Sequence, residues 1–317
     1  MQKRPQKQQI FLVFNTSHLG DTLLCNSLCR NIKNLYPNSK IVFIVNKPFY
    51  EAALYQKDVD EVIAFDKFGE HKSLLSRIKF ILKFPYKRAD YAFVTYRNNT
   101  NSLIARLIMS KKIIEYTKKK IHVPMQEYFI NLLKNITDET LYPVPIKFEV
   151  SKDLPEHLRQ LLPSDKKYVA LCTLTTDKIK DIPIDTAIDT INLLVSKGYV
   201  PVFMGTGNNA QIYAENLRQN NCTFVDLVNK TSVKEIGAVL QNCEALISAD
   251  TGLVHVACGV GTPIVEIFNN PETIKQWAPD KNLYKISIIH ENKTANNIID
   301  KLEKLLEQNG NLPSCIM

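Results

Sequence analysis

A chain of 317 residues, 45% of them apolar and with no low-complexity stretch, is expected to form two globular domains rather than a disordered polymer. No apolar run approaches the roughly 20 residues of a membrane-spanning helix, and the early run at residues 10–14 is too short for a secretory signal. Seven scattered cysteines without a C-x-x-C pair predict reduced thiols and a cytoplasmic protein.

The net charge of +8 is concentrated in the first half of the chain. Residues 1–150 hold 24 Lys and Arg against 13 Asp and Glu, a charge of +11, whereas residues 151–317 hold 16 against 19, a charge of −3. This asymmetry favours an anionic partner for the first half, and nucleic acid, anionic lipid and a phosphorylated glycolipid all satisfy it. RNA is disfavoured, because no aromatic stacking motif accompanies the cations and the charge is confined to one half.

Strand and helix patterns alternate through the first half. Residues 10–15 and 40–46 predict buried strands, and the apolar residues between them recur at helical spacing as far as Pro37. Three further strands are predicted, at residues 57–66 with their centre at 62–65, at 91–95 and at 113–116. A β-α-β opening of this kind predicts a parallel sheet.

Prolines 143, 145, 155 and 163 interrupt the periodicity, and we therefore expect a linker over residues 141–165. A second alternating array follows. Its predicted strands are residues 168–173, 199–204, 224–227, 245–249 and 264–268, and its predicted helices are residues 186–197, a helix that ends near 240, residues 253–258 and a terminal helix at 294–308.

The turn at Asp250-Thr251-Gly252, between a predicted strand and a predicted helix, carries the clearest binding chemistry. Unpaired N–H groups and the positive end of a helix dipole would meet there and could hold a diphosphate without a metal. Asp250 could accept hydrogen bonds from sugar hydroxyls, and His255 falls on the first helical turn beside it. The alternative is that Asp250 or Thr251 is only a helix N-cap and His255 a half-buried side chain.

This segment resembles the signature of glycosyltransferase family 9, the ADP-heptose:lipopolysaccharide heptosyltransferases, which reads D-T-G-x-x-H-x-A and then G-x-P before a strand. The matching residues are Asp250, Thr251, Gly252, His255, Ala257, Gly261 and Pro263, and the similarity extends from about residue 10 to 280. The resemblance implies an α/β protein of GT-B fold, with two Rossmann-like parallel-sheet domains facing a central cleft.

In such a protein, residues 1–150 would bind the acceptor and residues 166–290 the nucleotide sugar. Residues 291–317 would hold a C-terminal helix that returns to the N-terminal domain. Family members also begin with a strand and the pattern S-x-x-G-D, which Ser17, Gly20 and Asp21 match here. The resemblance implies that Asp21 is the general base that removes the proton from the acceptor hydroxyl. Its alternative role is that of a first-turn acid that complements the helix dipole.

The resemblance also supplies a donor site in the second half. Paired threonines in the family bind the diphosphate, and a nearby lysine stabilises charge on the leaving group; Thr175, Thr176 and Lys180 match them, with Lys178 as a competitor for the lysine. Ile182 stands where the family usually has tryptophan. The remaining expected donor contacts, beside the Asp250–His255 turn, are Gly205, Lys230 and Thr231.

The basic segment 71–88 has an apolar face, which predicts either contact with an anionic membrane or packing on the sheet. The acceptor phosphates need cations and polar groups near Asp21. The candidates are Ser17, His18, Lys72, Arg77, Lys111, Lys112, Lys118, Lys119 and Lys120. The D-x-D letters at residues 58–60 are interpreted as a solvated loop, and no metal site is expected.

The predicted function is therefore that of an inverting, metal-independent glycosyltransferase without a cofactor. The resemblance implies heptose transfer from ADP-heptose to a lipopolysaccharide or lipooligosaccharide inner core, by single displacement, at the cytoplasmic face of the inner membrane. Its partners would be a nucleotide sugar and an anionic glycolipid, not nucleic acid. Two alternatives remain: a family member that uses another nucleotide sugar for a different glycan, and a non-catalytic nucleotide-sugar-binding protein.

Overall fold

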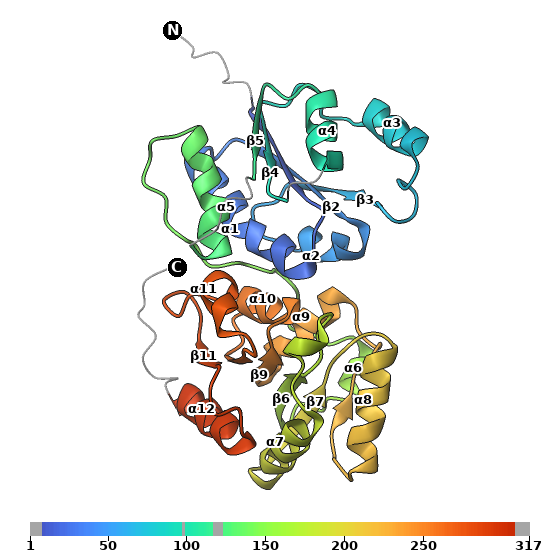
Figure 1. Ribbon diagram of the computed structural model, residues 1–317, viewed down its shortest axis with the longest axis vertical. Helices are drawn as coiled ribbons and strands as arrows, with labels where there is room; N and C mark the ends of the chain where they lie inside the picture. Colours follow the sequence, from blue (N-terminus) through green and yellow to red (C-terminus); the bar gives the residue numbers. More distant parts are fainter. Residues whose placement is uncertain (1–7, 97–98, 117–122, 308–317) are drawn as a thin grey trace. The chain divides into compact units, whose positions relative to one another are not determined.

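The computed structural model describes residues 8–96, 99–116 and 123–307. The chain divides into two compact units, residues 1–148 and 149–317, and each unit has its own parallel sheet and core (Figure 1). Sheets that are parallel throughout require crossover connections, and helices supply most of these here.

The first unit alternates strands and helices in the order that the sequence predicts. Its elements are β1 (Ile10–Asn15), α1 (Leu19–Leu35), β2 (Lys40–Asn46), the 3₁₀ turn η1 (Lys47–Phe49), α2 (Tyr50–Leu54), β3 (Glu61–Phe65), α3 (Leu74–Lys83), β4 (Tyr91–Val94), α4 (Asn99–Leu107), β5 (Lys112–Glu115), α5 (Met125–Asn131) and η2 (Leu132–Asn135). The sheet order is β3-β2-β1-β4-β5.

Both faces of this sheet are covered, which explains why β1 and β2 are almost uninterrupted apolar runs. Side chains of α4 and partly buried residues of α3 pack against one face, in a cluster that includes Leu12, Phe14 and Ile104. Helices α1, α2 and α5 contact one another and belong to the other layer (Figure 1). The order of the strands reverses between β1 and β4, and the carboxyl ends of strands at such a reversal are where open α/β sheets bind ligands.

The second unit repeats this architecture. Its elements are α6 (Glu156–Arg159), β6 (Lys167–Cys172), η3 (Lys178–Lys180), α7 (Ile184–Ser196), β7 (Tyr199–Phe203), α8 (Asn208–Gln219), β8 (Val225–Asp226), α9 (Val233–Gln241), β9 (Cys243–Ala249), α10 (Gly252–Val260), β10 (Ile264–Ile267), η4 (Pro271–Thr273), α11 (Ile274–Trp277), β11 (Ile286–Ile289) and α12 (Ala295–Glu307). The sheet order is β11-β10-β9-β6-β7-β8, which reverses between β6 and β9.

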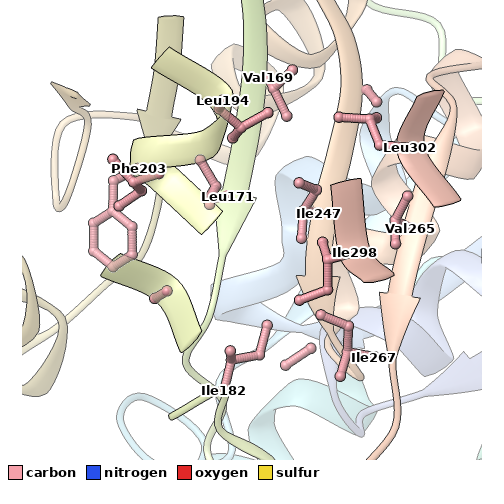
Figure 2. Packing of buried hydrophobic residues seen from close by; sticks show 14 of the residues in the cluster. Val169, Leu171, Ile182, Leu194, Phe203, Ile247, Val265, Ile267, Ile298 and Leu302 are labelled. Carbon is pink, nitrogen blue, oxygen red and sulfur yellow. The ribbon is translucent and has the colours of Figure 1, made fainter. Parts of the chain in front are cut away.

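One face of the second sheet packs against α7 and α12. Figure 2 shows this core, in which Ile247 of β9 and Val265 of β10 lie beside Ile298 and Leu302 of α12, and Leu171 of β6 lies nearer to Leu194 of α7. Alternate residues on the same strands point to the opposite face, beneath α10. The polar residues Ser248 and Glu266 occupy that second face, next to each other in the register of β9 and β10.

Helix α12 packs within the second unit, and the return of the C-terminal helix to the first domain stays a prediction. This helix buries Ile298, Ile299, Leu302 and Leu305 in the core of the second unit, and Lys197 at the end of α7 pairs with its Glu303 at 2.7 Å. The helix packs there because its apolar face covers β9, β10 and β11, whose apolar residues on this side would otherwise be open to water.

The proline-rich stretch 141–165 is less independent than a linker. Ser27 on α1 donates to the Val144 carbonyl at 3.0 Å, so the first part of the stretch is bound to the first unit. Gln241 and Asn242 at the end of α9 donate to the carbonyls of Val150 and Lys152, which binds the next part to the second unit. The division between the units falls between residues 148 and 149.

Candidate active site

The turn between β9 and α10 is built as a helix N-terminus. Thr251 is the N-cap, with extended backbone (φ −134°), and its hydroxyl accepts the Leu253 N–H at 3.3 Å. At the other end, Gly261 has φ +82°, a left-handed conformation that lets the chain leave the helix and enter β10. The N-cap interpretation of Thr251 is therefore confirmed, and it coexists with the positive end of the α10 dipole.

The loops after β6 and β9 meet at the point where the strand order reverses. Lys180, which follows β6, pairs with Asp250, which follows β9, at 2.7 Å between Nζ and Oδ2. Thr251 Oγ1 also lies 3.3 Å from Ser248 Oγ and 3.9 Å from Cys172 Sγ. Lys180 and Asp250 are 70 residues apart in the sequence, and the structure brings them together beside the N-terminus of α10.

The loop that carries Lys180 is held by groups that the sequence analysis missed. Asp181 accepts the Thr175 N–H at 2.7 Å, and the Asn269 side chain donates to the carbonyls of Ile179 and Asp181, both at 2.9 Å. Lys293 in turn donates to the Asn269 Oδ1. Asn269 follows the end of β10. Polar residues just after a parallel strand often line a binding site, and this position in the sequence could have identified Asn269 as a candidate site residue.

The two predicted threonines differ in their surroundings. Thr175 donates its hydroxyl to the Asp177 carbonyl and accepts the Asp177 N–H, which folds the loop locally, whereas Thr176 is exposed. Lys178 is exposed as well, and only Lys180 reaches Asp250. Ile182, at the position where the family has tryptophan, is 3% exposed and belongs to the hydrophobic core.

His255 on α10 is buried, and its Nδ1 has no partner among the described residues. Burial lowers its pKa to about 4, and the Asp250 carboxylate acts in the opposite direction. The imidazole is therefore neutral at physiological pH and can donate only one hydrogen bond.

Glu266 is a second buried group at this corner, one that the sequence analysis treated only as part of a strand. It is 1% exposed, its Oε2 has no partner among the described residues, and it lies beside Ser248 in the sheet. Burial raises its pKa well above the usual range, Asp250 raises it further, and Lys180 opposes the shift. Burial of this carboxyl group thus favours its protonated form.

The glycine loop after β7 lies at the same edge of the sheet. Gly205 accepts the Asn229 N–H at 3.0 Å, and the Gly207 N–H donates to the Asn229 side chain at 2.6 Å, so the loops after β7 and β8 are joined. A Cβ at Gly205 would lie 2.9 Å from the Cβ of Ala210. Lys230 donates to the Asp226 carbonyl, and Thr231 is half-buried beside it.

In the first unit, Asp21 lies at the start of α1, just past the carboxyl end of β1. Its Oδ2 accepts the Ser17 hydroxyl at 2.8 Å, and the Ser17 N–H donates to Asn15. Asn15 is itself bonded to Thr95 and Cys25. Burial raises the pKa of Asp21, and the hydrogen bond from Ser17 partly offsets the shift. A carboxylate with a raised pKa is a better proton acceptor than an exposed one.

Three residues that the sequence analysis missed lie at this edge of the first sheet. Lys67 donates to the Thr16 carbonyl at 2.9 Å, its Nζ lies 6.0 Å from the centre of the Tyr96 ring, and burial lowers its pKa. Tyr116 follows β5, and burial raises its pKa, with Tyr128 and Asp21 adding to the shift. A cation and two aromatic rings near an acid form a surface suited to a charged sugar.

Among the described residues, His18 acts electrostatically on Asp21, whereas the predicted acceptor lysines and Arg77 have other partners or are exposed. Lys111 and Lys112 stand where β5 begins, at the opposite edge of the sheet; Lys111 pairs with Asp90 at 2.6 Å, and Lys112 donates to the Asn135 carbonyl. Arg77 donates to His71 and Thr100, and Lys72 is exposed. His18 is exposed at the N-cap of α1. Lys118, Lys119 and Lys120 lie outside the described residues.

The two aspartates of the D-x-D letters are ion-paired, which differs from the solvated loop that the sequence suggested. Asp58 pairs with Arg30 at 3.4 Å, and Asp60 pairs with Lys33 at 2.7 Å and accepts the Ile41 N–H. Over residues 8–96, 99–116 and 123–307, no group of three or more His, Cys, Asp or Glu is arranged to hold a metal ion. Helices that are long and apolar enough to cross a bilayer are absent from the same part of the chain.

Two Rossmann-like units with sites at their strand-order reversals define a GT-B glycosyltransferase fold. The profile of glycosyltransferase family 9 (heptosyltransferase) matches residues 99–306, and the chain belongs to this family and is a glycosyltransferase.

Among known proteins, the chain is similar to lipooligosaccharide heptosyltransferase 2 of Haemophilus influenzae, with 28% identity over 94 residues, which are 27% of this chain and 26% of that one. The matched segment thus spans about a quarter of that relative. Its fold is shared with a family 9 glycosyl transferase of Veillonella parvula (TM-score 0.83, 18% identity, 96% of this chain and 100% of that one). It is also shared with the E. coli ADP-heptose lps heptosyltransferase II (TM-score 0.75, 18% identity, 96% and 100%).

Proposed function

We propose that this protein is an inverting heptosyltransferase that transfers heptose from ADP-heptose to a lipopolysaccharide or lipooligosaccharide inner-core acceptor. The observation that carries the proposal is the corner at which Lys180, Asp250 and the N-terminus of α10 meet. ADP-heptose and this type of acceptor are taken from the names of the similar proteins.

The donor half of the reaction follows from the chemistry of this corner. A diphosphate at the N-terminus of α10 would compete with Asp250 for the Lys180 ammonium group. Asp250, once released from that ion pair, could accept hydrogen bonds from hydroxyl groups of the donor. As the bond between the anomeric carbon and the diphosphate breaks, negative charge grows on the leaving nucleotide, and Lys180 and the helix N–H groups stabilise it. No metal ion is needed for this step.

The acceptor half is assigned to Asp21. In a single displacement, the acceptor oxygen forms a bond to the anomeric carbon while the bond to the diphosphate oxygen breaks, and the acceptor proton passes to the Asp21 carboxylate. The anomeric configuration is inverted. Lys67, Tyr96 and Tyr116 are proposed to bind the acceptor, and Lys67 supplies the cation for its phosphate.

The test is to incubate the full chain with a panel of nucleotide sugars that includes ADP-heptose, ADP-glucose and UDP-N-acetylglucosamine. We expect ADP-heptose to raise the unfolding temperature most. Heptose transfer to a purified inner-core acceptor should then be detected by mass spectrometry, be unaffected by EDTA, and give the inverted anomer by NMR.

Transfer of a different sugar would instead identify a family member that serves another glycan. Binding of ADP-heptose without transfer to any acceptor would favour a non-catalytic nucleotide-sugar-binding protein.

A further inference from the structure

Helix α3 has two apolar faces, and within the part of the chain that the structure describes only one of them packs against other residues. Phe80 and Ile81 pack against the core of the first unit. Leu74, Leu75, Ile78 and Leu82 form a stripe on the outer side of the helix, and they are 68%, 80%, 44% and 67% exposed. Single exposed apolar side chains are ordinary, but four on one helical stripe mark an interaction surface.

The neighbouring helix α4 extends this exposed apolar surface. Leu103 and Leu107, one helical turn apart, are 48% and 50% exposed, although α4 also packs against the core. Arg77 on α3 donates to Thr100 on α4 at 3.3 Å, which links the two helices (Figure 1).

The charge of the segment that carries the α3 stripe is positive. Residues 71–89 contain six Lys and Arg and no Asp or Glu, and Lys79 and Lys83 lie on α3 itself. Of the carboxylates near this segment, Asp66 pairs with Lys47, Asp90 with Lys111 and Glu115 with Arg106, and the exposed Glu70 lies 3.9 Å from the His71 imidazole. Two copies of the chain that paired through this helix would place cations against cations, so the charge favours an anionic partner over a second copy.

We propose that α3 is the docking helix of this protein for an anionic lipid bilayer. An amphipathic helix lies in the plane of a membrane interface with its apolar stripe among the acyl chains and its cations at the headgroup phosphates. The α3 stripe supplies the leucines, and Lys79 and Lys83 supply the charge.

The position of α3 in the chain gives this contact a use. Lys67, at the start of the connection between β3 and α3, donates to the Thr16 carbonyl beside Ser17 and Asp21. Phe68, the next residue, is 74% exposed. This step rests on the proposed transfer to a glycolipid. Given that transfer, docking at α3 holds the lipid surface next to the residues that are proposed to bind the acceptor.

The experiment is flotation of the full chain with phosphatidylcholine vesicles, with and without phosphatidylglycerol, in the absence of any sugar. We expect binding only to the anionic vesicles, and weaker binding at high salt. The double variant Leu75→Gln/Leu82→Gln should bind about a hundredfold more weakly, because two buried leucines are lost. Lys79→Gln/Lys83→Gln should bind roughly tenfold or more weakly, because two cations near the surface are lost.

The matched control is Val195→Gln/Ile212→Gln, which removes two exposed apolar residues of the second unit. It should bind like the wild type, and circular dichroism should show that all variants are folded. The proposal would be overturned if the wild type did not bind anionic vesicles or if the leucine variant bound as well as the wild type. It would also be overturned if the control variant lost as much binding as the leucine variant. A wild-type dimer in ultracentrifugation that the leucine variant dissociates would overturn it in favour of self-association.

A second measurement separates this inference from the proposed function. The leucine variant should transfer heptose to a water-soluble inner-core oligosaccharide at the wild-type rate, but more slowly to the same oligosaccharide on lipid in vesicles. If the wild type bound vesicles but transferred heptose to neither acceptor, the proposed function would be contradicted and the docking helix would not. Equal transfer to both acceptors without vesicle binding would contradict the docking helix alone.

Discussion

Asp21 and Lys180, the two residues assigned to the reaction, have opposite electrostatic surroundings. Asp21 has a hydroxyl donor but no ion-pair partner among the described residues, and burial raises its pKa. Lys180 already pairs with a carboxylate. We expect Asp21→Asn to lower kcat by about 10² or more, because the amide cannot accept the proton. The measurement is turnover under saturating donor, and near-wild-type turnover would remove Asp21 from the mechanism.

Ser17 offers a finer test of the same carboxylate. Its hydroxyl donates to Asp21 and favours the charged form, so Ser17→Ala should raise the pKa of Asp21 still further. If Asp21 is the general base, the acidic limb of the kcat profile must then move to higher pH. A loss of kcat with no shift of the pH profile would indicate that Ser17 only supports the loop.

His255 and Glu266 should give stability opposite dependences on pH. The pKa of His255 is about 4 in the folded chain and near 6.5 when unfolded, so below about pH 6.5 the unfolded chain binds a proton that the folded chain does not. Stability is therefore lost as the pH falls toward 4, by roughly 3 kcal/mol for this group. Glu266 has a raised pKa, so the unfolded chain releases its proton first, and stability falls as the pH rises above about 4.5.

The corresponding variants are His255→Gln and Glu266→Gln, with urea unfolding measured between about pH 4 and 7. His255→Gln should reduce the loss of stability on the acid side, and Glu266→Gln should reduce the fall as the pH rises. If the free energy of unfolding of a variant changes with pH as that of the wild type does, the replaced side chain has the same pKa in the folded and the unfolded chain.

At the scale of elements, the stability of α10 depends on its C-terminal end at Gly261 as much as on its N-cap. Gly261 has φ +82°, and a Cβ there would meet no atom within 4 Å, so the cost of a side chain is one of backbone conformation alone. We expect Gly261→Ala to lower the free energy of unfolding by about 1 kcal/mol, and Gly261→Asn by less, because asparagine tolerates the left-handed region better. Urea unfolding measures both, and equal stabilities for the three proteins would contradict the argument.

At the scale of the whole molecule, the donor and the base belong to units with separate cores. A donor that binds only the folded chain should stabilise it by about 2.7 kcal/mol at about 100 times its Kd. Asp21→Asn should keep this stabilisation by ADP-heptose, whereas Lys180→Ala should lose most of it at the same concentration. Thermal unfolding with and without ADP-heptose tests this, and loss of the effect in Asp21→Asn would place Asp21 in donor binding.

Much of the fold was predictable from local pattern. Buried parallel strands read as short apolar runs, and the predicted strands at residues 10–15 and 40–46 have the bounds of β1 and β2. The Asp250-Thr251-Gly252 turn was recognisable because the helix N-cap, the glycines and the flanking strands are adjacent in the chain. The roles of Asp21 and Lys180 remain predictions, since these rest on family resemblance and on the proposal made here.

What the sequence alone determined is the alternation of elements, the family and the N-terminal turn of α10, because each depends on residues that are neighbours in the chain. Only the tertiary structure decided that Lys180 pairs with Asp250, that Asn269 and Glu266 join this corner, and that α12 belongs to the second unit. The reason is strand order: the reversal between β6 and β9 brings distant loops together, and no local pattern encodes which strands become neighbours.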